Sequence, residues 1–267
     1  MRYYVLPYYI ATLDIECLSL DPRPVVDEFT VIITRLLPYD APCPLNFTVA
    51  GHHNYSMDWW KTESNGGSEK MPIASSIYHP NLDIQFLNGH TCSDETLKFR
   101  QRVFDKNKIN HNFLKRAALE SRWPIQQIAD SIRMDFQHYD VQEVWINHPE
   151  FDAPRLEAMF KLEENCWPIW KDFHMVENIG TVKRLHRAIG SSQDPFKAVE
   201  LGPIGELRGG TTMHHAVMRH SSFGDCCYNL WVLGQARYLY AQRSRNELVE
   251  DGLNVQYTGD TVTVEKT

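Results

Sequence analysis

Four carboxylates and one histidine of this chain have the types and spacing that metal-dependent hydrolysis requires. Asp14 and Glu16 stand two positions apart in LDIECL, a stretch that predicts a β-strand, so both side chains should project from one face. Neighbouring carboxylates repel each other unless a cation lies between them, and their hard oxygen ligands suit Mg²⁺ or Mn²⁺. Taken alone, the pair also fits the solvated face of a strand.

Asp152 and Asp225 each lie near the start of an expected helix. Asp152 follows the apolar segment VQEVWI, at the carboxyl end of an expected strand, where open α/β sheets bind their ligands; it could also simply cap the helix. Asp225 begins a long amphipathic helix, and His220 precedes it by five residues. A neutral imidazole at that place could accept a proton from an attacking water.

The strands expected to position these residues belong to an α/β domain. We expect strands over residues 3–15, 28–37, 141–146 and 173–178, the first two joined by the turn-rich LSLDPRP into a hairpin. Residues 38–80 are expected to be irregular, and residues 246–267 could form a small hairpin near Thr258 or fray.

Helices are expected to alternate with these strands, over residues 93–115, 123–139, from 149 onward, over 181–189 and over 222–243. The helix over 123–139 has the clearest pattern, because five apolar residues recur at spacings of three and four. They are Ile125, Ile128, Ala129, Ile132 and Phe136.

Composition indicates a globular protein. The chain has 267 residues, of which 43% are hydrophobic and 23% charged, enough to bury a sizeable core. No stretch approaches the roughly 20 apolar residues of a membrane helix, and the aromatic start lacks a cleavage site, so we expect a strand there and no membrane partner. The six cysteines form no CxxC pair, which favours the cytoplasm over a disulfide framework. The net charge of -7 argues against a non-specific duplex binder.

The order of these motifs resembles the DEDDh (DnaQ-like) 3'-5' exonucleases of the RNase H-like superfamily. The resemblance covers residues 3–242, with long unmatched connections. The motifs follow in this order: a strand with DxE, a hairpin, a strand followed by Asp and a helix, and His-x4-Asp before a helix. Trp59-Trp60 in SMDWWKTES, Phe151-Asp152 and residues 220–227 are similar to the phage and bacterial exoribonuclease-like branch.

The resemblance implies one elaborated RNase H-like domain over residues 1–245, with an insertion over about 65–122 and a C-terminal extension over 246–267. Its mixed central sheet would be flanked by helices on both faces, with the strand of the second motif parallel to the first strand. The implied site holds two Mg²⁺ or Mn²⁺ ions, with Asp14 bridging both, and His220 is the general base. The other implied metal ligands are Glu16, Asp152 and Asp225.

The implied activity releases nucleoside 5'-monophosphates from 3' ends of single-stranded or overhanging nucleic acid. Likeness to the phage branch favours DNA as substrate and, for a phage protein, the host cytoplasm as compartment; an exoribonuclease is the alternative. A homo-oligomer remains open. In an inert binding module of the same fold, one or more carboxylates are usually lost, whereas all four can be assigned here.

Six further residues are expected to contact the nucleic acid. Cys17 and Leu18 stand where family members often carry Thr and Gly, so Leu18 could wedge against the last base. Tryptophan faces can stack on any base, although the two tryptophans could also pack in the core. The histidine that precedes a helix could instead cap that helix. The other expected contacts are Phe151, His148, Trp59 and Trp60.

Two further clusters admit other interpretations. Lys183, Arg184 and Arg187 could bind phosphates or lie on the solvated face of a helix. His214 and His215, with His220, suggest a zinc hydrolase, but adjacent histidines point in different directions and no HExxH accompanies them.

Overall fold

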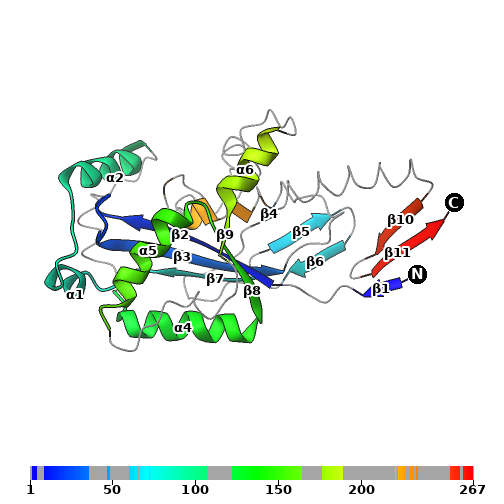
Figure 1. The fold of residues 1–267 in the computed structure, drawn as a ribbon, viewed down its shortest axis with the longest axis horizontal. Coiled ribbons are helices and arrows are strands. Elements are labelled where there is room, and N and C mark those ends of the chain that lie inside the picture. Colours follow the sequence, from blue (N-terminus) through cyan, green and yellow to red (C-terminus); the bar gives the residue numbers. More distant parts are fainter. Residues whose placement is uncertain are drawn as a thin grey trace.

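The centre of the protein, seen in a computed structural model, is a mixed sheet of five strands in the order β7-β3-β2-β8-β9 (Figure 1). The strands are β2 (Tyr9–Cys17), β3 (Val26–Arg35), β7 (Ile73–Tyr78), β8 (Val141–Ile146) and β9 (Val176–Asn178). The structure describes residues 2–4, 9–35, 47–48, 60–64, 67–71, 73–106, 122–163, 176–188, 220, 222–226, 229–230, 233, 253–258 and 261–266.

Strand directions agree with the expected arrangement. β3 pairs antiparallel with β2 and with β7, whereas β2 pairs parallel with β8, and β8 with β9. The parallel pairs require crossovers, in which α4 (Ile125–His138) precedes β8 and α5 (Pro149–Phe160) follows it. The α/β class, the antiparallel hairpin and the parallel strand of the second motif are therefore confirmed.

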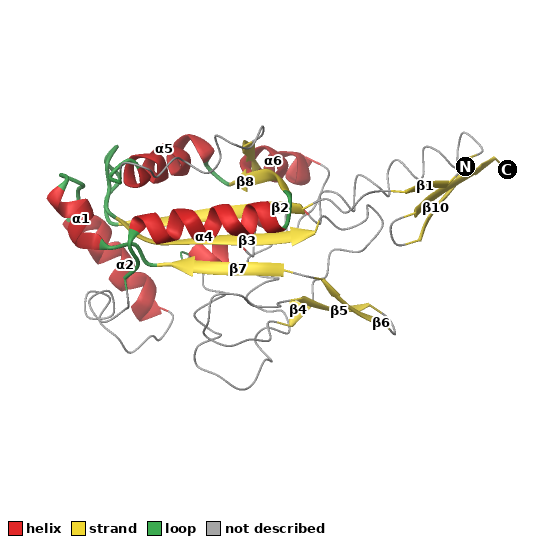
Figure 2. Cartoon of the chain, turned by 90° about the horizontal axis from the view of Figure 1, so that it is seen from below, coloured by secondary structure: helices red, strands yellow, loops and turns green. Residues whose placement is uncertain are grey.

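One face of the sheet forms the hydrophobic core together with α4 and α5. Alternate residues of β2 and β3 lie opposite one another on this face, as in the pairs Ala11 with Ile33 and Leu13 with Val31. α4 runs alongside the strands and buries the apolar stripe expected from its sequence (Figure 2). From α5, Leu156, Met159 and Phe160 complete this core.

The opposite face of β2 and β3 carries polar residues and is covered by helical residues 222–226. Glu28 Oε1 accepts the hydroxyl of Ser222 at 2.6 Å, and the Thr30 hydroxyl lies 2.6 Å from that of Ser222. Asp14 and Glu16 project from this same face, because their partners in the register are Thr30 and Glu28. Helical segments thus cover both faces of the sheet.

The first expected strand, over residues 3–15, is in fact two strands. β1 (Arg2–Tyr4) pairs with β11 (Thr261–Lys266), which also pairs with β10 (Leu253–Thr258). Pro7 stands between β1 and β2 and has no N–H to donate to a ladder. The hairpin near Thr258 is confirmed, and this small sheet brings the two termini together at one end of the molecule (Figure 1).

The expectation of an irregular segment over residues 38–80 is wrong where strands occur. β4 (Phe47–Thr48), β5 (Trp60–Ser64) and β6 (Gly67–Met71) form a second small sheet. β7 lies within the expected insertion at 65–122 but forms an edge of the central sheet. Its sequence IASSIY has few strongly apolar residues and gives no clear local signal for a strand. Pairing with β3 is what makes this segment a strand.

Three further helices are α1 (Leu82–Leu87), α2 (Asp94–Lys106) and α6 (Ile179–Ala188). The last two match the helices expected over 93–115 and 181–189, with shorter or shifted bounds. Main-chain hydrogen bonds tie the turn after β2 to the segment before α2, through Val25 to Thr91 and Ser93 to Leu18, both at 2.8 Å. No helix in the described part of the chain is long and apolar enough to cross a membrane.

Candidate metal centre

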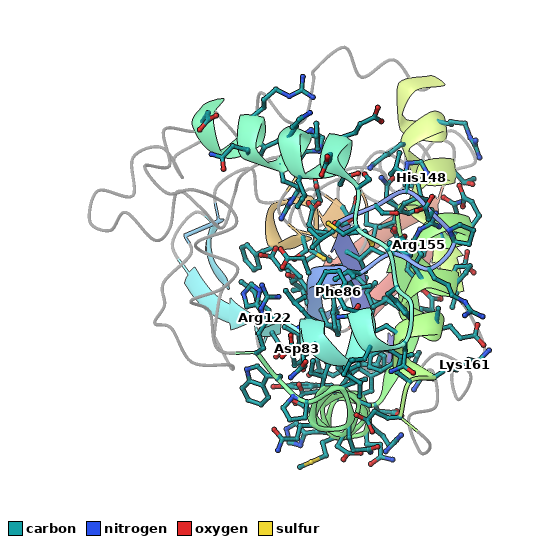
Figure 3. The ribbon with its side chains drawn as sticks, turned by 90° about the vertical axis from the view of Figure 1, so that its left-hand side faces the viewer. Asp83, Phe86, Arg122, His148, Arg155 and Lys161 are labelled. Atoms are coloured by element: carbon teal, nitrogen blue, oxygen red, sulfur yellow. The ribbon has the colours of Figure 1, made fainter. Side chains whose placement is uncertain are left out.

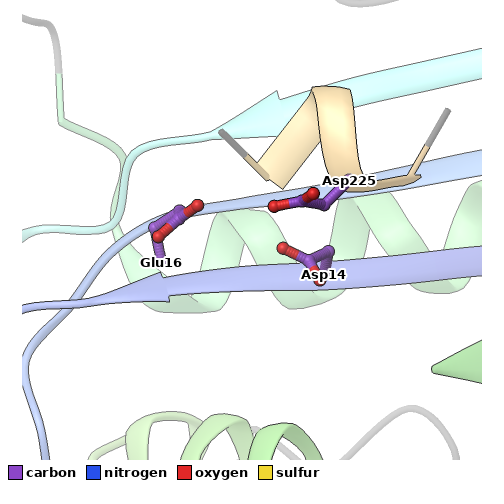
Figure 4. Close-up of side chains that lie close together, drawn as sticks. All are labelled: Asp14, Glu16 and Asp225. Atoms are coloured by element: carbon purple, nitrogen blue, oxygen red, sulfur yellow. The ribbon is translucent and has the colours of Figure 1, made fainter. Parts of the chain in front are cut away.

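Three carboxylates from two distant parts of the sequence meet on the polar face of the sheet. Asp14, Glu16 and Asp225 each present a ligand oxygen, and these oxygens all lie within 4.8 Å of one another (Figure 4). The alternation of β2 sends Asp14 and Glu16 to one face, and the helical segment 222–226 brings Asp225 over it. The structure thus brings three of the four expected carboxylates together, and their role as metal ligands stays a prediction.

Burial dominates the electrostatics of this cluster, and the crowding of negative charge adds to its effect. Asp14 is only 9% exposed, and its burial raises the pKa of its carboxyl well above the usual value, as do the neighbouring charges of Asp225 and Asp152. Burial likewise raises the pKa of Glu16, against the opposing effect of Arg100. A divalent cation would relieve this repulsion, so the site fits such an ion.

Asp152 lies near this cluster without joining the three oxygens at ligand distance. It is 6% exposed in the first turn of α5, where its N–H donates to the His148 carbonyl at 2.9 Å. Burial raises its pKa to about 7, with Arg155 opposing the shift and Asp225 adding to it. Asp152 therefore shares the electrostatic environment of the site, as a fourth carboxylate.

His220 borders the cluster with an unusual backbone. Its φ is +65°, a left-handed conformation uncommon for residues other than glycine. Its N–H donates to Asp225 Oδ2 at 3.1 Å, and its carbonyl accepts a hydrogen bond from Arg100 Nη1 at 2.6 Å. The exposed imidazole meets the ring of Phe99 edge to face, with centroids 5.1 Å apart.

The donor set is typical of a hard cation. The group of three contains only carboxylates, and such oxygens suit Mg²⁺ or Mn²⁺ better than zinc, which favours imidazole and thiolate. His214 and His215, on which a zinc site would depend, lie outside the described residues.

The expectation that Leu18 wedges against a base is wrong for this structure. Leu18 is only 4% exposed and packs with Val25 and Val103. Leu20, two residues further, is 75% exposed, and its carbonyl accepts a hydrogen bond from Arg155 at 2.8 Å. Because successive residues of the turn point in different directions, the DxE motif alone does not predict which leucine faces solvent.

The adjoining Cys17 is half-buried at an irregularity in the pairing of β2 with β3. Burial raises the pKa of its thiol, mainly through desolvation and then through Asp152. The thiol therefore stays protonated near pH 7, and a contact of Cys17 with substrate remains a prediction.

The other expected substrate contacts differ in accessibility. Phe151 is half-buried, and the guanidinium of Arg155 stacks 3.3 Å from its ring centroid, so one ring face is already covered. His148 is exposed, with Nδ1 3.3 Å from Glu150 Oε1, and Figure 3 shows it on the same side of the molecule as Arg155. Trp59 and the side chain of Trp60 lie outside the described residues.

Of the two members of the expected basic cluster whose side chains the structure describes, Lys183 acts on the site. Its Nζ donates to Asn147 Oδ1 at 2.7 Å, and its charge lowers the pKa of Asp14. Arg184 is exposed and donates to the Thr181 hydroxyl at 3.1 Å, whereas the side chain of Arg187 lies outside the described residues.

Arg100 is a neighbour of the site that sequence patterns did not indicate. Its Nη1 lies 2.8 Å from Glu16 Oε2 and donates to the His220 carbonyl. It comes from the charged segment of α2, in which nothing distinguishes it from Arg102. Only the tertiary contact of α2 with the site selects one arginine of this helix.

Comparison with known proteins adds no relative: no protein-family model matches the chain, and no curated protein matches it.

The raised pKa values predict how the stability of the metal-free protein depends on pH. The carboxyl of Asp152 ionises near pH 4 in the unfolded chain and near pH 7 in the folded protein, so the folded state binds the additional proton between these values. The contribution of Asp152 to stability should therefore be full below about pH 4 and decrease as the pH rises to about 7. Urea unfolding in EDTA at pH 4.5 to 7.5 measures it.

The matched variant for this measurement is Asp152→Asn, which cannot ionise. We expect the free energy of unfolding of the variant to decrease less over this pH interval than that of the wild type. Saturating Mg²⁺ should reduce the decrease in the wild type, because cations bind the deprotonated carboxylates. Parallel profiles for the two proteins in EDTA would contradict the assignment of a raised pKa to Asp152.

Proposed function

We propose that this protein is a metal-dependent 3'-5' exonuclease with an RNase H-like fold and a DEDDh site. The observation that supports this most strongly is the convergence of Asp14, Glu16 and Asp225 within 4.8 Å, as the motif order implies. The mixed sheet, with its antiparallel hairpin and the parallel β8, is compatible with that fold. Asp152 supplies the fourth acidic residue.

In this proposal Asp14, Glu16, Asp152 and Asp225 hold two Mg²⁺ or Mn²⁺ ions. The ions, when bound, supply an activated water on one side of the phosphodiester and relief of charge on the leaving 3'-oxygen on the other. These carboxylates would hold the ions at the polar face of β2, where the burial of Asp14 and Asp152 would limit screening of the charges by water.

His220 acts in this proposal as the general base, since a neutral imidazole accepts a proton near pH 7. Its main chain is held at both ends, by Asp225 and by Arg100, so the backbone that carries the ring is anchored beside the acidic cluster. The exposed side chain can then reach an incoming 3' end.

Single-stranded or overhanging 3' ends are the proposed substrate, with DNA preferred and RNA as the alternative. The net charge of -7 disfavours tight binding of the phosphate backbone by the protein alone. Substrate binding should therefore require the cations.

The test of this function is incubation of the purified protein with 5'-labelled 3'-overhang DNA and RNA of matched sequence, in Mg²⁺, in Mn²⁺ and in EDTA. We expect a metal-dependent ladder that shortens from the 3' end and releases nucleoside 5'-monophosphates. The faster substrate decides between DNA and RNA. Absence of shortening in both metals would refute the exonuclease and favour a binding module.

A further inference from the structure

We infer that Arg100 of α2 is a positioning residue, which holds the Glu16 carboxylate and the His220 main chain together at the acidic cluster. This inference rests on the proposed function, because it assigns a role within the same site. It adds to that function a requirement for α2, a helix of the expected insertion over about 65–122.

The contacts of Arg100 join two parts of the site that are distant in sequence. A single nitrogen, Nη1, lies 2.8 Å from Glu16 Oε2 and 2.6 Å from the His220 carbonyl oxygen. The side chain is only 4% exposed. A guanidinium stays charged in proteins, and its hydrogen bonds to a carboxylate are among the stronger and more directional ones.

The ion pair orients Glu16. With Arg100 on Oε2, the carboxylate is restrained in rotation and one of its oxygens is left for a cation. Arg100 also offsets part of the negative charge of Glu16, Glu28 and Asp27, all of which act on it electrostatically. The cluster can therefore keep its ligands in place before a cation binds.

The hydrogen bond to the His220 carbonyl restrains the proposed base. A left-handed conformation at a residue other than glycine persists only where its surroundings hold it. Asp225 holds the N–H and Arg100 the carbonyl, while Phe99, next to Arg100 in α2, contacts the imidazole. Two consecutive residues of α2 thus restrain the backbone and the ring of His220.

Loss of Arg100 should have opposite effects on turnover and on cation binding. Glu16 and His220 would lose their common restraint, which slows the chemistry. The cluster would at the same time lose a neighbouring positive charge, so a divalent cation should bind no more weakly than before. General damage to the fold would instead weaken both properties.

The test compares Arg100→Gln with Arg102→Gln, the same change at an exposed position of the same helix. For Arg100→Gln we expect kcat to fall about 10–100-fold, the usual effect of losing a residue that orients metal ligands, with KM unchanged. Calorimetric titration of Mn²⁺ into the metal-free protein should show an affinity equal to or higher than that of the wild type. Arg102→Gln should match the wild type in every measurement.

A second measurement needs no activity. The Cε1–H resonance of His220 in the metal-free protein, assigned through its absence in His220→Asn, should shift toward the position of a solvated histidine in Arg100→Gln. Arg100→Lys keeps the positive charge but not the planar guanidinium. Its kcat and its His220 resonance should therefore lie between those of the wild type and those of Arg100→Gln. If Arg100→Gln does not fold, Arg100→Lys carries the test.

Unchanged kcat and an unmoved His220 resonance in Arg100→Gln would overturn the inference, as would Mn²⁺ binding weakened in proportion to kcat. If the wild type cleaves no substrate, the proposed function fails while the resonance and the Mn²⁺ titration still test the restraint by Arg100. Failure of the proposed exonuclease function can thus be distinguished from failure of the role proposed for Arg100.

Discussion

Asp14→Asn should lower hydrolysis by about a thousandfold or more, because Asp14 is one of the carboxylates that would hold the cations and the other three carboxylates all act on it. Loss of a cation's stabilisation of the transition state costs about 4 kcal/mol or more, and each 1.4 kcal/mol is about tenfold in rate. The measurement is the rate of shortening of 5'-labelled DNA in Mg²⁺ and Mn²⁺. The matched control is Asp105→Asn, at an exposed aspartate of α2. Asp105 accepts a hydrogen bond from Gln101, and the amide oxygen of asparagine can still accept it.

The same Asp14→Asn substitution should leave the metal-free protein folded and somewhat more stable. The carboxylates of Asp225, Asp152 and Glu16 all disfavour ionised Asp14, so a neutral amide removes repulsion. A relief of about 1 kcal/mol would raise the Tm by about 2–4 °C for a chain of this length. Thermal melting in EDTA and in Mn²⁺ measures the change in Tm. The increase in Tm that Mn²⁺ causes should be smaller in the variant than in the wild type. Full activity, or a large loss of Tm in EDTA, would remove Asp14 from the proposed role.

The elements that sequence patterns predicted best are those with a strong internal period. The stripe of α4, from Ile125 to Phe136, repeats at helical spacing and is buried as expected. The alternation in LDIECL separates Leu13 and Ile15, which face the core, from Asp14 and Glu16. In both cases the period follows from backbone geometry and needs no knowledge of the partner surface.

Features that depend on contacts between distant segments were not predictable in the same way. The pairing of β1 with β11 joins the two ends of the chain, and Arg100 reaches His220 across 120 positions. Leu18 and Leu20 are chemically alike, and contacts of the turn with Val25 and with Val103 of α2 bury the first. Local pattern describes a segment's preference, whereas these placements are decided by the surface that the segment meets.

His220→Asn should slow hydrolysis by about 10²–10⁴-fold, the usual contribution of a positioned base, without preventing Mn²⁺ binding. Asparagine is the informative replacement because it tolerates the left-handed φ of +65° and keeps the main-chain contacts with Asp225 and Arg100, while it removes the imidazole. His138→Asn, at an exposed histidine in the last turn of α4, controls for the loss of a histidine elsewhere.

The two measurements on His220→Asn separate a base from a ligand. The three carboxylates form their group without His220, so Mn²⁺ affinity by calorimetry should stay at the wild-type value while kcat falls. A fall in Mn²⁺ affinity parallel to kcat would make the imidazole a ligand of the cation. Wild-type kcat would instead exclude His220 from the chemistry.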